Sequence, residues 1–178
     1  MRAPSYLLLL PVIASLTLAL PGLAQGESCA AYLKRKQVRG SLVLFSKVDK
    51  RICYFFGGKV RFAAPASYGS QEGKKRFVGD KKTPEGRYTL APARQSKSYG
   101  LFMHISYPNA ADRAYAKRFK RRPGSAIGVH GPPRRFSFLG GIVTWFNATD
   151  GCILLKEGDM RRLAKVMRRA TPMLILGR

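Results

Sequence analysis

Short apolar runs separated by turn residues fill much of the chain from residue 41 onward. The runs Leu42–Val48, Ile52–Phe56 and Lys59–Ala64 are continuous or alternating in hydrophobicity, and Asp49-Lys50 and Gly57-Gly58 interrupt them. This spacing predicts three antiparallel strands that form a meander. Further apolar runs predict strands at Arg87–Leu90, Leu101–Ser106 and Met173–Leu176.

Two segments have the signals of helices. Asn109 is a suitable N-cap for a helix through Ala110–Lys120, whose exposed face would be strongly basic. A second helix is predicted after a cap at Glu157 or Asp159 and before a stop at Pro172, because apolar residues recur there with helical spacing. These apolar residues are Met160, Leu163, Ala164 and Met167. The whole pattern predicts one mainly β domain with a few helices, an α+β fold.

The N-terminus has the pattern of a secretory signal peptide. Arg2 precedes Tyr6–Leu20, an uncharged run of fifteen residues, and small residues follow at Gly22-Leu23-Ala24. We therefore expect a signal peptide at 1–24, an N-terminal extension at 25–40 and a folded domain at 41–178.

Two other interpretations of the N-terminus are weaker. An uncleaved membrane anchor needs about 20 apolar residues, whereas this run is shorter and contains Pro11. A lipid-modified Cys29 is disfavoured because it follows Glu27-Ser28 and lies far from the apolar run. We therefore expect no transmembrane anchor after the signal peptide is cleaved.

The composition predicts a packed core and a surface with a large positive charge. The chain has 178 residues, 46% of them hydrophobic, which suits one compact domain and excludes general disorder. Its 33 basic and 9 acidic side chains give a net charge of +24. Such a charge favours nucleic acid, anionic lipid or an acidic polymer as partner, and the predicted export argues against nucleic acid.

Three cysteines leave one thiol unpaired in an oxidising compartment. Cys29 and Cys53 both lie in the N-terminal third of the chain, far in sequence from Cys152. We therefore predict a disulfide between Cys29 and Cys53, the alternative being that both are buried thiols. Cys152 would remain free.

Cys152 and His130 have the chemistry of a nucleophile and its base. A free thiol titrates at about 8.5 and needs a nearby base or positive charge to ionise near neutral pH. His130 is one of only two histidines in the chain, and a fold that brings it to Cys152 would supply that base. Gly151 leaves the backbone before the sulfur unobstructed, so that amide N–H groups could face a developing oxyanion.

Three sequence blocks stand out together: Gly79–Tyr88 (GDKKTPEGRY), Gly128–Gly131 (GVHG) and Thr149–Ile153 (TDGCI). They resemble the L,D-transpeptidase catalytic-domain (YkuD) family of bacterial cell-wall enzymes. Their order and spacing match over about residues 41–155, and the block Leu101–Arg113 resembles one branch of the family.

The resemblance implies a β-sandwich catalytic domain of the L,D-transpeptidase type, and an activity. Cys152 would attack a carbonyl in a peptidoglycan stem peptide and form a thioester, while His130 moves the protons and amides at Gly151 and Cys152 hold the oxyanion. The acyl group would pass to a second stem peptide or to a wall-attached lipoprotein, or to water in a hydrolase or amidase of the same fold. No cofactor or metal is implied, and the location would be the periplasm or cell envelope.

This chain departs from the family pattern at two positions. The family commonly has a second histidine where this chain has Asp150, which could orient His130 or simply cap a turn. The family also usually has Arg or Asn where this chain has Leu154, so that its function would have to be supplied elsewhere, with Arg134 or Arg135 as candidates.

Other candidate residues carry two interpretations each. His104 lies in a predicted strand and is either a hydrogen-bonded core residue or a substrate contact. Trp145 would either wall the substrate groove or pack in the core. The same choice applies to its aromatic neighbours Phe136, Phe138 and Phe146.

Two functions of other classes remain. His104, His130 and Cys152 could bind a catalytic zinc ion in a metallopeptidase, although no metal-binding spacing supports this. Alternatively, the domain could be a non-catalytic module that binds an anionic wall polymer through its charge.

Overall fold

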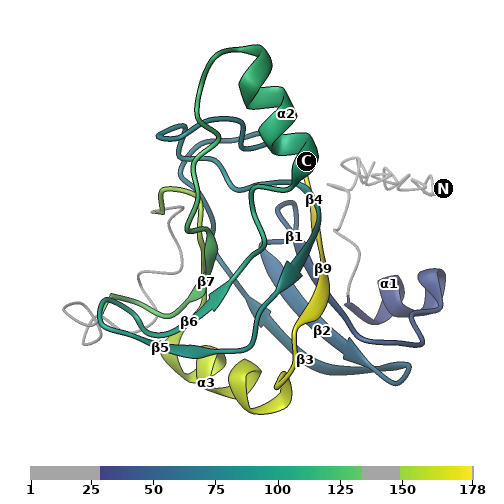
Figure 1. Cartoon of the computed structure of the whole chain (residues 1–178). Coiled ribbons are helices and arrows are strands. Elements are labelled where there is room, and N and C mark those ends of the chain that lie inside the picture. The colour runs from purple at the N-terminus through teal and green to yellow at the C-terminus, as the bar shows by residue number, and fades with distance from the viewer. Residues whose placement is uncertain (1–28, 134–148, 178) are drawn as a thin grey trace, which may run out of the picture.

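A computed structural model of the chain describes residues 29–133 and 149–177 (Figure 1). The predicted signal peptide at 1–24 lies outside these ranges. Within them, the helices are α1 (Cys29–Lys36), α2 (Ala110–Arg118) and α3 (Glu157–Val166). The strands are β1 (Leu42–Ser46), β2 (Arg51–Phe56), β3 (Lys59–Pro65), β4 (Gly86–Leu90), β5 (Arg94–Ser96), β6 (Gly100–His104), β7 (Gly128–His130), β8 (Ile153–Leu154) and β9 (Thr171–Leu176). None of the helices in this part of the chain is long and apolar enough to cross a membrane.

The strands form two sheets. The larger has the order β3-β2-β1-β9-β4, with β1 and β9 parallel and the other neighbours antiparallel. The smaller has the order β5-β6-β7-β8, with a parallel pair only between β7 and β8. The predicted mainly β fold with a few helices is therefore confirmed.

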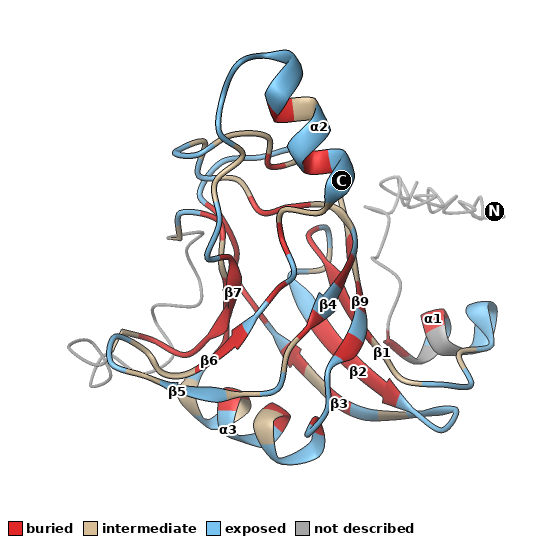
Figure 2. Ribbon diagram, in the orientation of Figure 1, coloured by how far each residue is buried: buried red, intermediate tan, exposed pale blue. Residues whose placement is uncertain are grey.

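The main core lies between the two sheets (Figure 2). Alternate residues of β1, Val43 and Phe45, point into the same apolar cluster as Val129 of β7 and Ile153 of β8. Such alternation follows from the two-residue period of a strand. The core-facing side of the smaller sheet is thereby fixed, and the opposite side is left for other contacts.

Helix α1 covers the outer face of the larger sheet. Tyr32 of α1 stacks on Phe55 of β2 with ring centroids 6.0 Å apart, and Leu44 of β1 joins the same second cluster. Apolar residues of β1 and β2 thus pack on both faces of the sheet. This explains why their sequences read as nearly continuous apolar runs.

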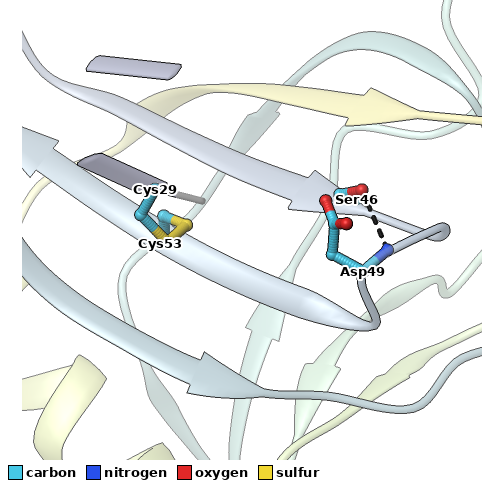
Figure 3. Close-up of a disulfide and its surroundings, with 4 residues drawn as sticks. All are labelled: Cys29, Ser46, Asp49 and Cys53. Carbon is cyan, nitrogen blue, oxygen red and sulfur yellow. Dashed lines mark hydrogen bonds between the residues drawn. A yellow bond between two sulfur atoms is a disulfide. The ribbon is translucent and has the colours of Figure 1, made fainter. Parts of the chain in front are cut away.

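The Cys29–Cys53 disulfide joins α1 to β2 (Figure 3). Within the segment predicted only as an N-terminal extension, Cys29–Lys36 is therefore a helix that is covalently attached to the sheet. Beside it, the turn between β1 and β2 is closed by the Asp49 N–H, which donates to Ser46 Oγ at 3.2 Å.

The meander and the first predicted helix match the structure. β1, β2 and β3 pair antiparallel in sequence order, and Asn109 caps α2 in a reciprocal capping box with Asp112. In this box, the Asp112 N–H donates to Asn109 Oδ1 at 3.0 Å, and the Asn109 N–H donates to Asp112 Oδ2 at 3.1 Å.

The predicted ends of the last helix are wrong. α3 has Lys156 at its N-cap position without a side-chain hydrogen bond, so neither Glu157 nor Asp159 is the cap. The helix ends at Val166, and Pro172 lies inside β9 instead of stopping it. Pro172 is tolerated there because it pairs only with Thr89 of β4, while pairing with β1 begins one residue later.

Removing the disulfide should lower the stability of the fold. Cys29 and Cys53 are 24 residues apart, and closing a loop of that size contributes about 3 kcal/mol. We expect the Cys29→Ser/Cys53→Ser variant, made in a Cys152→Ala background, to lose about that much unfolding free energy in urea. The Cys152→Ala protein alone is the control, and an unchanged unfolding midpoint would contradict this role.

Candidate active site

His130 lies on the face of the smaller sheet that points away from the core. It is opposite Phe102 of β6 and Leu154 of β8, whereas its neighbour Val129 pairs with Met103 and faces the core. Paired residues of adjacent strands share a face of the sheet. Phe102, His130 and Leu154 therefore line one surface.

Cys152 comes immediately before β8 on the same surface. Continuing the β7–β8 register by one residue sets Cys152 opposite Gly128, two residues from His130 along β7. Strand spacing and rise put the Cys152 and His130 Cα atoms about 8 Å apart, which a thiol and an imidazole ring can bridge. The Sγ atom also lies 3.7 Å from the Ala126 carbonyl oxygen. The parallel strand pair thus puts the predicted nucleophile and base on the same face of the sheet, on neighbouring strands.

Aromatic rings fix the plane of the His130 side chain. The imidazole is 4% exposed and stacks on Tyr99 with centroids 4.0 Å apart, while Phe102 lies 6.1 Å away on an almost parallel plane. The Phe102 ring also covers Gly128, where an added Cβ would lie 2.3 Å from it. Gly128 is therefore required for this ring to lie flat beside His130.

A backbone hydrogen bond selects the tautomer of His130. Its Nδ1 lies 2.7 Å from the Gly131 carbonyl oxygen, which can only accept a hydrogen bond. Nδ1 therefore carries the proton, and Nε2 is left with a lone pair that can accept one. Burial lowers the pKa of His130, although the bond to Gly131 opposes the shift. The ring is thus a neutral base near pH 7.

The thiol of Cys152 is also neutral at rest. Burial raises its pKa, and the charge of Asp150 acts in the same direction. The Gly128 N–H and the buried cation of Lys75 favour the thiolate but do not outweigh burial. A neutral imidazole on the same face as a neutral thiol has the chemistry of a general base for that thiol.

Close packing of three backbone segments holds the turn before Cys152. Gly151 has a φ of +125°, and a Cβ there would lie 2.4 Å from the Lys82 carbonyl oxygen. The buried Thr83 hydroxyl accepts a hydrogen bond from the Gly69 N–H at 2.9 Å and donates one to the Gly151 carbonyl at 2.8 Å. No larger residue fits at position 151 without moving Cys152.

Thr149 braces the same turn from the other side. Its Oγ1 donates to the Cys152 carbonyl at 2.6 Å and accepts from the Gly151 N–H at 3.2 Å. The Gly151 amide, which was expected to face an oxyanion, is therefore already engaged. Gly151 serves the site through its backbone shape.

Two buried lysines hold the loop that supplies Thr83. Lys47 is 0% exposed and donates to the carbonyl oxygens of Gly73 and Thr83 and to Glu85 Oε1, at 2.8, 2.9 and 2.7 Å. Lys75 donates to Asp80 Oδ1 at 2.7 Å. Each buried charge is thus paired with a carboxylate, as stability requires.

Asp80 organises the tip of this loop. Burial acts to raise its pKa, but hydrogen bonds from Lys75 and from the backbone N–H groups of Phe77, Arg76 and Lys82 outweigh it and hold the pKa below its ordinary value. The carboxylate therefore remains ionised and keeps Lys75 beside the site.

The remaining predicted site residues fall into two groups. His104 is exposed and lies opposite Gly128 on the same face as His130, so its interpretation as a core histidine is wrong. Asp150 is also exposed, and the structure does not bring it to His130 Nδ1, which bonds to Gly131. Trp145, Arg134, Arg135 and the phenylalanines at 136, 138 and 146 lie outside the described residues.

The zinc hypothesis finds no support in the geometry. Within residues 29–133 and 149–177, no three His, Cys, Asp or Glu side chains group as metal ligands, and this range contains His104, His130 and Cys152.

Comparison with known proteins places this site in a family. A sequence model of the L,D-transpeptidase catalytic domain (YkuD) matches residues 40–175. The chain belongs to this family. The L,D-transpeptidase resemblance and the fold predicted from it are therefore confirmed. No curated protein sequence matches the chain.

Solved structures agree with the family assignment. The helical cell shape determining protein Pgp2 from Campylobacter jejuni is 27% identical, with a TM-score of 0.61 over 78% of this chain and 48% of that one. Bd1075 from Bdellovibrio bacteriovorus is 25% identical, with a TM-score of 0.54 over 79% of this chain and 49% of that one. This L,D-transpeptidase domain therefore spans about half the length of these two relatives. The E. faecium L,D-transpeptidase catalytic domain shares the fold, with 15% identity and a TM-score of 0.51 over 78% of this chain and 98% of that one.

Thr83 should be essential for the stability of this family member. Thr83→Val removes the hydroxyl and leaves the Gly69 N–H and the Gly151 carbonyl buried without their partner. This should lower the free energy of unfolding by at least about 2 kcal/mol. We expect a lower unfolding midpoint in urea and faster alkylation of Cys152. Thr83→Ser, which keeps the hydroxyl, is the matched control. Equal behaviour of the Val and Ser variants would contradict the bridging role.

The reactivity of Cys152 should report its raised pKa. We expect the rate of alkylation by iodoacetamide to rise with pH to a midpoint above about 8.5, the ordinary value for a thiol. Asp150→Asn removes a charge that disfavours the thiolate, so it should lower this midpoint. A midpoint below that of free cysteine would show a resting thiolate and contradict the neutral pair.

Proposed function

We propose that the protein is an exported cysteine acyltransferase that carries out the L,D-transpeptidase reaction on peptidoglycan stem peptides. The observation that supports the proposal is the β7–β8 register, which puts Cys152 on the same face as His130, whose Nδ1 bonds to Gly131 and leaves the acceptor lone pair on Nε2. The family assignment supports the substrate class. The Campylobacter relative Pgp2 is a helical cell shape determining protein, and a role in cell shape agrees with action on the wall.

In the first half-reaction, Cys152 Sγ attacks the carbonyl carbon that follows the L-centre of a donor stem. His130 Nε2 takes the thiol proton as the new S–C bond forms. The tetrahedral intermediate then collapses, the C–N bond breaks, and the imidazolium gives its proton to the departing amine of the terminal D-residue. A thioester on Cys152 remains.

The negative charge of the intermediate needs a hydrogen-bond donor beside the sulfur. Because the Gly151 N–H already donates to Thr149, we assign this role to the Cys152 N–H. The backbone shape of Gly151 and its contacts with Thr83 would hold this amide in place.

In the second half-reaction, an amine attacks the thioester. His130 removes a proton from the acceptor, the C–S bond breaks, and the sulfur recovers its proton. If the amine is a side-chain amine of a second stem, the product is a cross-link between stems. If the amine belongs to a lipoprotein, the product is a lipoprotein attached to the wall. Water in place of the amine makes the same site a hydrolase. The reaction belongs in the periplasm or cell envelope.

His104 is the substrate contact that we propose on the described part of the surface. It is exposed, shares the face that carries His130, and lies across Gly128 from Cys152. An imidazole in that position can donate to a carboxylate of a bound stem.

The function is tested by incubating the reduced protein with defined muropeptides and reading the products by mass spectrometry. We expect cross-linked dimers or exchanged terminal residues, and we expect both to disappear in Cys152→Ala and in His130→Ala. Lys117→Gln, which also removes one charge but at an exposed residue near the end of α2, is the control variant.

Two other outcomes would change the assignment. Shortened stems without joined products would identify a hydrolase on the same fold. Identical spectra for the parent and Cys152→Ala would exclude Cys152 as the nucleophile and favour a wall-binding module without catalysis.

A further inference from the structure

One side of α3 carries a row of cations. Met160 and Leu163 point into the main core, and Met167 beyond the helix end does the same. The other side bears Arg161, Arg162 and Lys165, and Arg168 and Arg169 follow the helix. All five basic residues are exposed. Figure 1 shows α3 lying across the lower end of the two sheets.

The C-terminal end of α3 opens into a basic groove. The groove has a volume of about 720 Å³, and its lining includes Tyr54, Phe56, Arg61, Lys165, Arg168 and Arg169. A smaller hollow of about 400 Å³ adjoins it, shares Arg61 and Lys165, and adds Arg162. Neither lining contains an Asp or Glu residue.

Most of these cations have no carboxylate partner. Arg162 pairs with Asp159 at 2.5 Å. Arg61, Lys165, Arg168 and Arg169 form no ion pair with any residue in the described ranges. Like charges gathered in a concave surface repel one another and favour an anionic occupant.

The N-terminal end of α3 lies beside the catalytic histidine. Glu157 packs against Gly131, where an added Cβ would lie 2.7 Å from its Oε2. A hollow of about 440 Å³ there is lined by Tyr99, which stacks on His130, and by Arg161. At 1.5 Å per residue, Glu157 and Lys165 are about 12 Å apart along the helix. α3 therefore runs from the catalytic pocket, where Arg161 pairs with Glu157 at 3.2 Å, to the basic groove.

We propose that the basic groove binds a second segment of the acidic wall polymer while the catalytic site acts on the first. The proposed occupant is a glycan strand with carboxylate-bearing peptides. This inference rests on the function proposed above. The carboxylates of these peptides match the unpaired cations. The exposed ring of Phe56, 54% accessible, offers an apolar face to a sugar ring or a peptide side chain. A concave groove suits an extended chain better than a flat lipid surface.

The test compares two variants with equal loss of charge. The groove variant is Arg61→Gln/Lys165→Gln/Arg168→Gln, and the control variant is Lys117→Gln/Arg118→Gln/Lys120→Gln, whose residues are exposed at and just after the end of α2. Both are made in the Cys152→Ala background, so that binding is measured without catalysis. Purified peptidoglycan sacculi and anionic phosphatidylglycerol vesicles are the two probes, in co-sedimentation at several salt concentrations.

We expect the groove variant to bind sacculi about tenfold more weakly, because it loses three exposed ionic contacts. The affinity of this variant for sacculi should also depend less on salt concentration. The control variant should bind sacculi like its parent. With Cys152 restored, the groove variant should still act on soluble stem peptides at the parent rate. If the enzyme acts on soluble stem peptides but the groove variant binds sacculi as tightly as the control variant and the parent do, the groove proposal is wrong. The proposed function would stand.

Two further results would also overturn the proposal. Equal weakening by the groove and control variants would show that sacculi respond to overall charge. Groove-dependent binding to the vesicles but not to sacculi would identify a membrane surface as the occupant. Failure of the parent enzyme on soluble stems would count against the proposed function and leave the binding comparison valid.

Discussion

The packing of Gly151 against the Lys82–Thr83 backbone is the constraint on which the site depends. A Cβ at position 151 would meet the Lys82 carbonyl oxygen at 2.4 Å, and the Thr83 hydroxyl ties the Gly151 carbonyl to the Gly69 amide. The β8 strand that follows is only two residues long and could not hold its register alone. The loop that carries Thr83 thus decides where Cys152 lies relative to His130.

That loop in turn depends on buried charge. Lys47 has no exposed surface and bonds to three oxygens of the loop and of Glu85, while Lys75 is held by Asp80. Removing either carboxylate would leave an ammonium group buried without its partner, which costs several kcal/mol in proteins, on the order of 3–5. The same Lys75 cation favours the Cys152 thiolate. Stability and the chemistry of the Cys152 thiol therefore share Lys75.

The sequence predicted the parts of the molecule whose signals are local. The alternation in β1 to β3 and the Asn109 cap of α2 depend on neighbouring residues, and both were predicted correctly. α1 and β7 were missed because their burial depends on distant partners: Cys53 for the helix, and β6 and β8 for the strand. Thr83 carries no local mark of its role, since its hydrogen-bond partners, Gly69 and Gly151, became neighbours only through folding. Thr149 bonds within its own turn, to residues two and three positions along the chain, and its part in holding that turn was not predicted. Cys152 and His130 were predicted as nucleophile and base because few residue types perform acyl transfer.

The most direct test of the proposed chemistry is the intact mass of the protein after brief exposure to a donor stem peptide. Acylation predicts a mass increase equal to the donor less its released D-residue, located on Cys152 by peptide mapping and absent in Cys152→Ala. Cleaved or joined products from a protein whose Cys152 never carries that mass, or an adduct that persists in Cys152→Ala, would contradict a thioester at this residue.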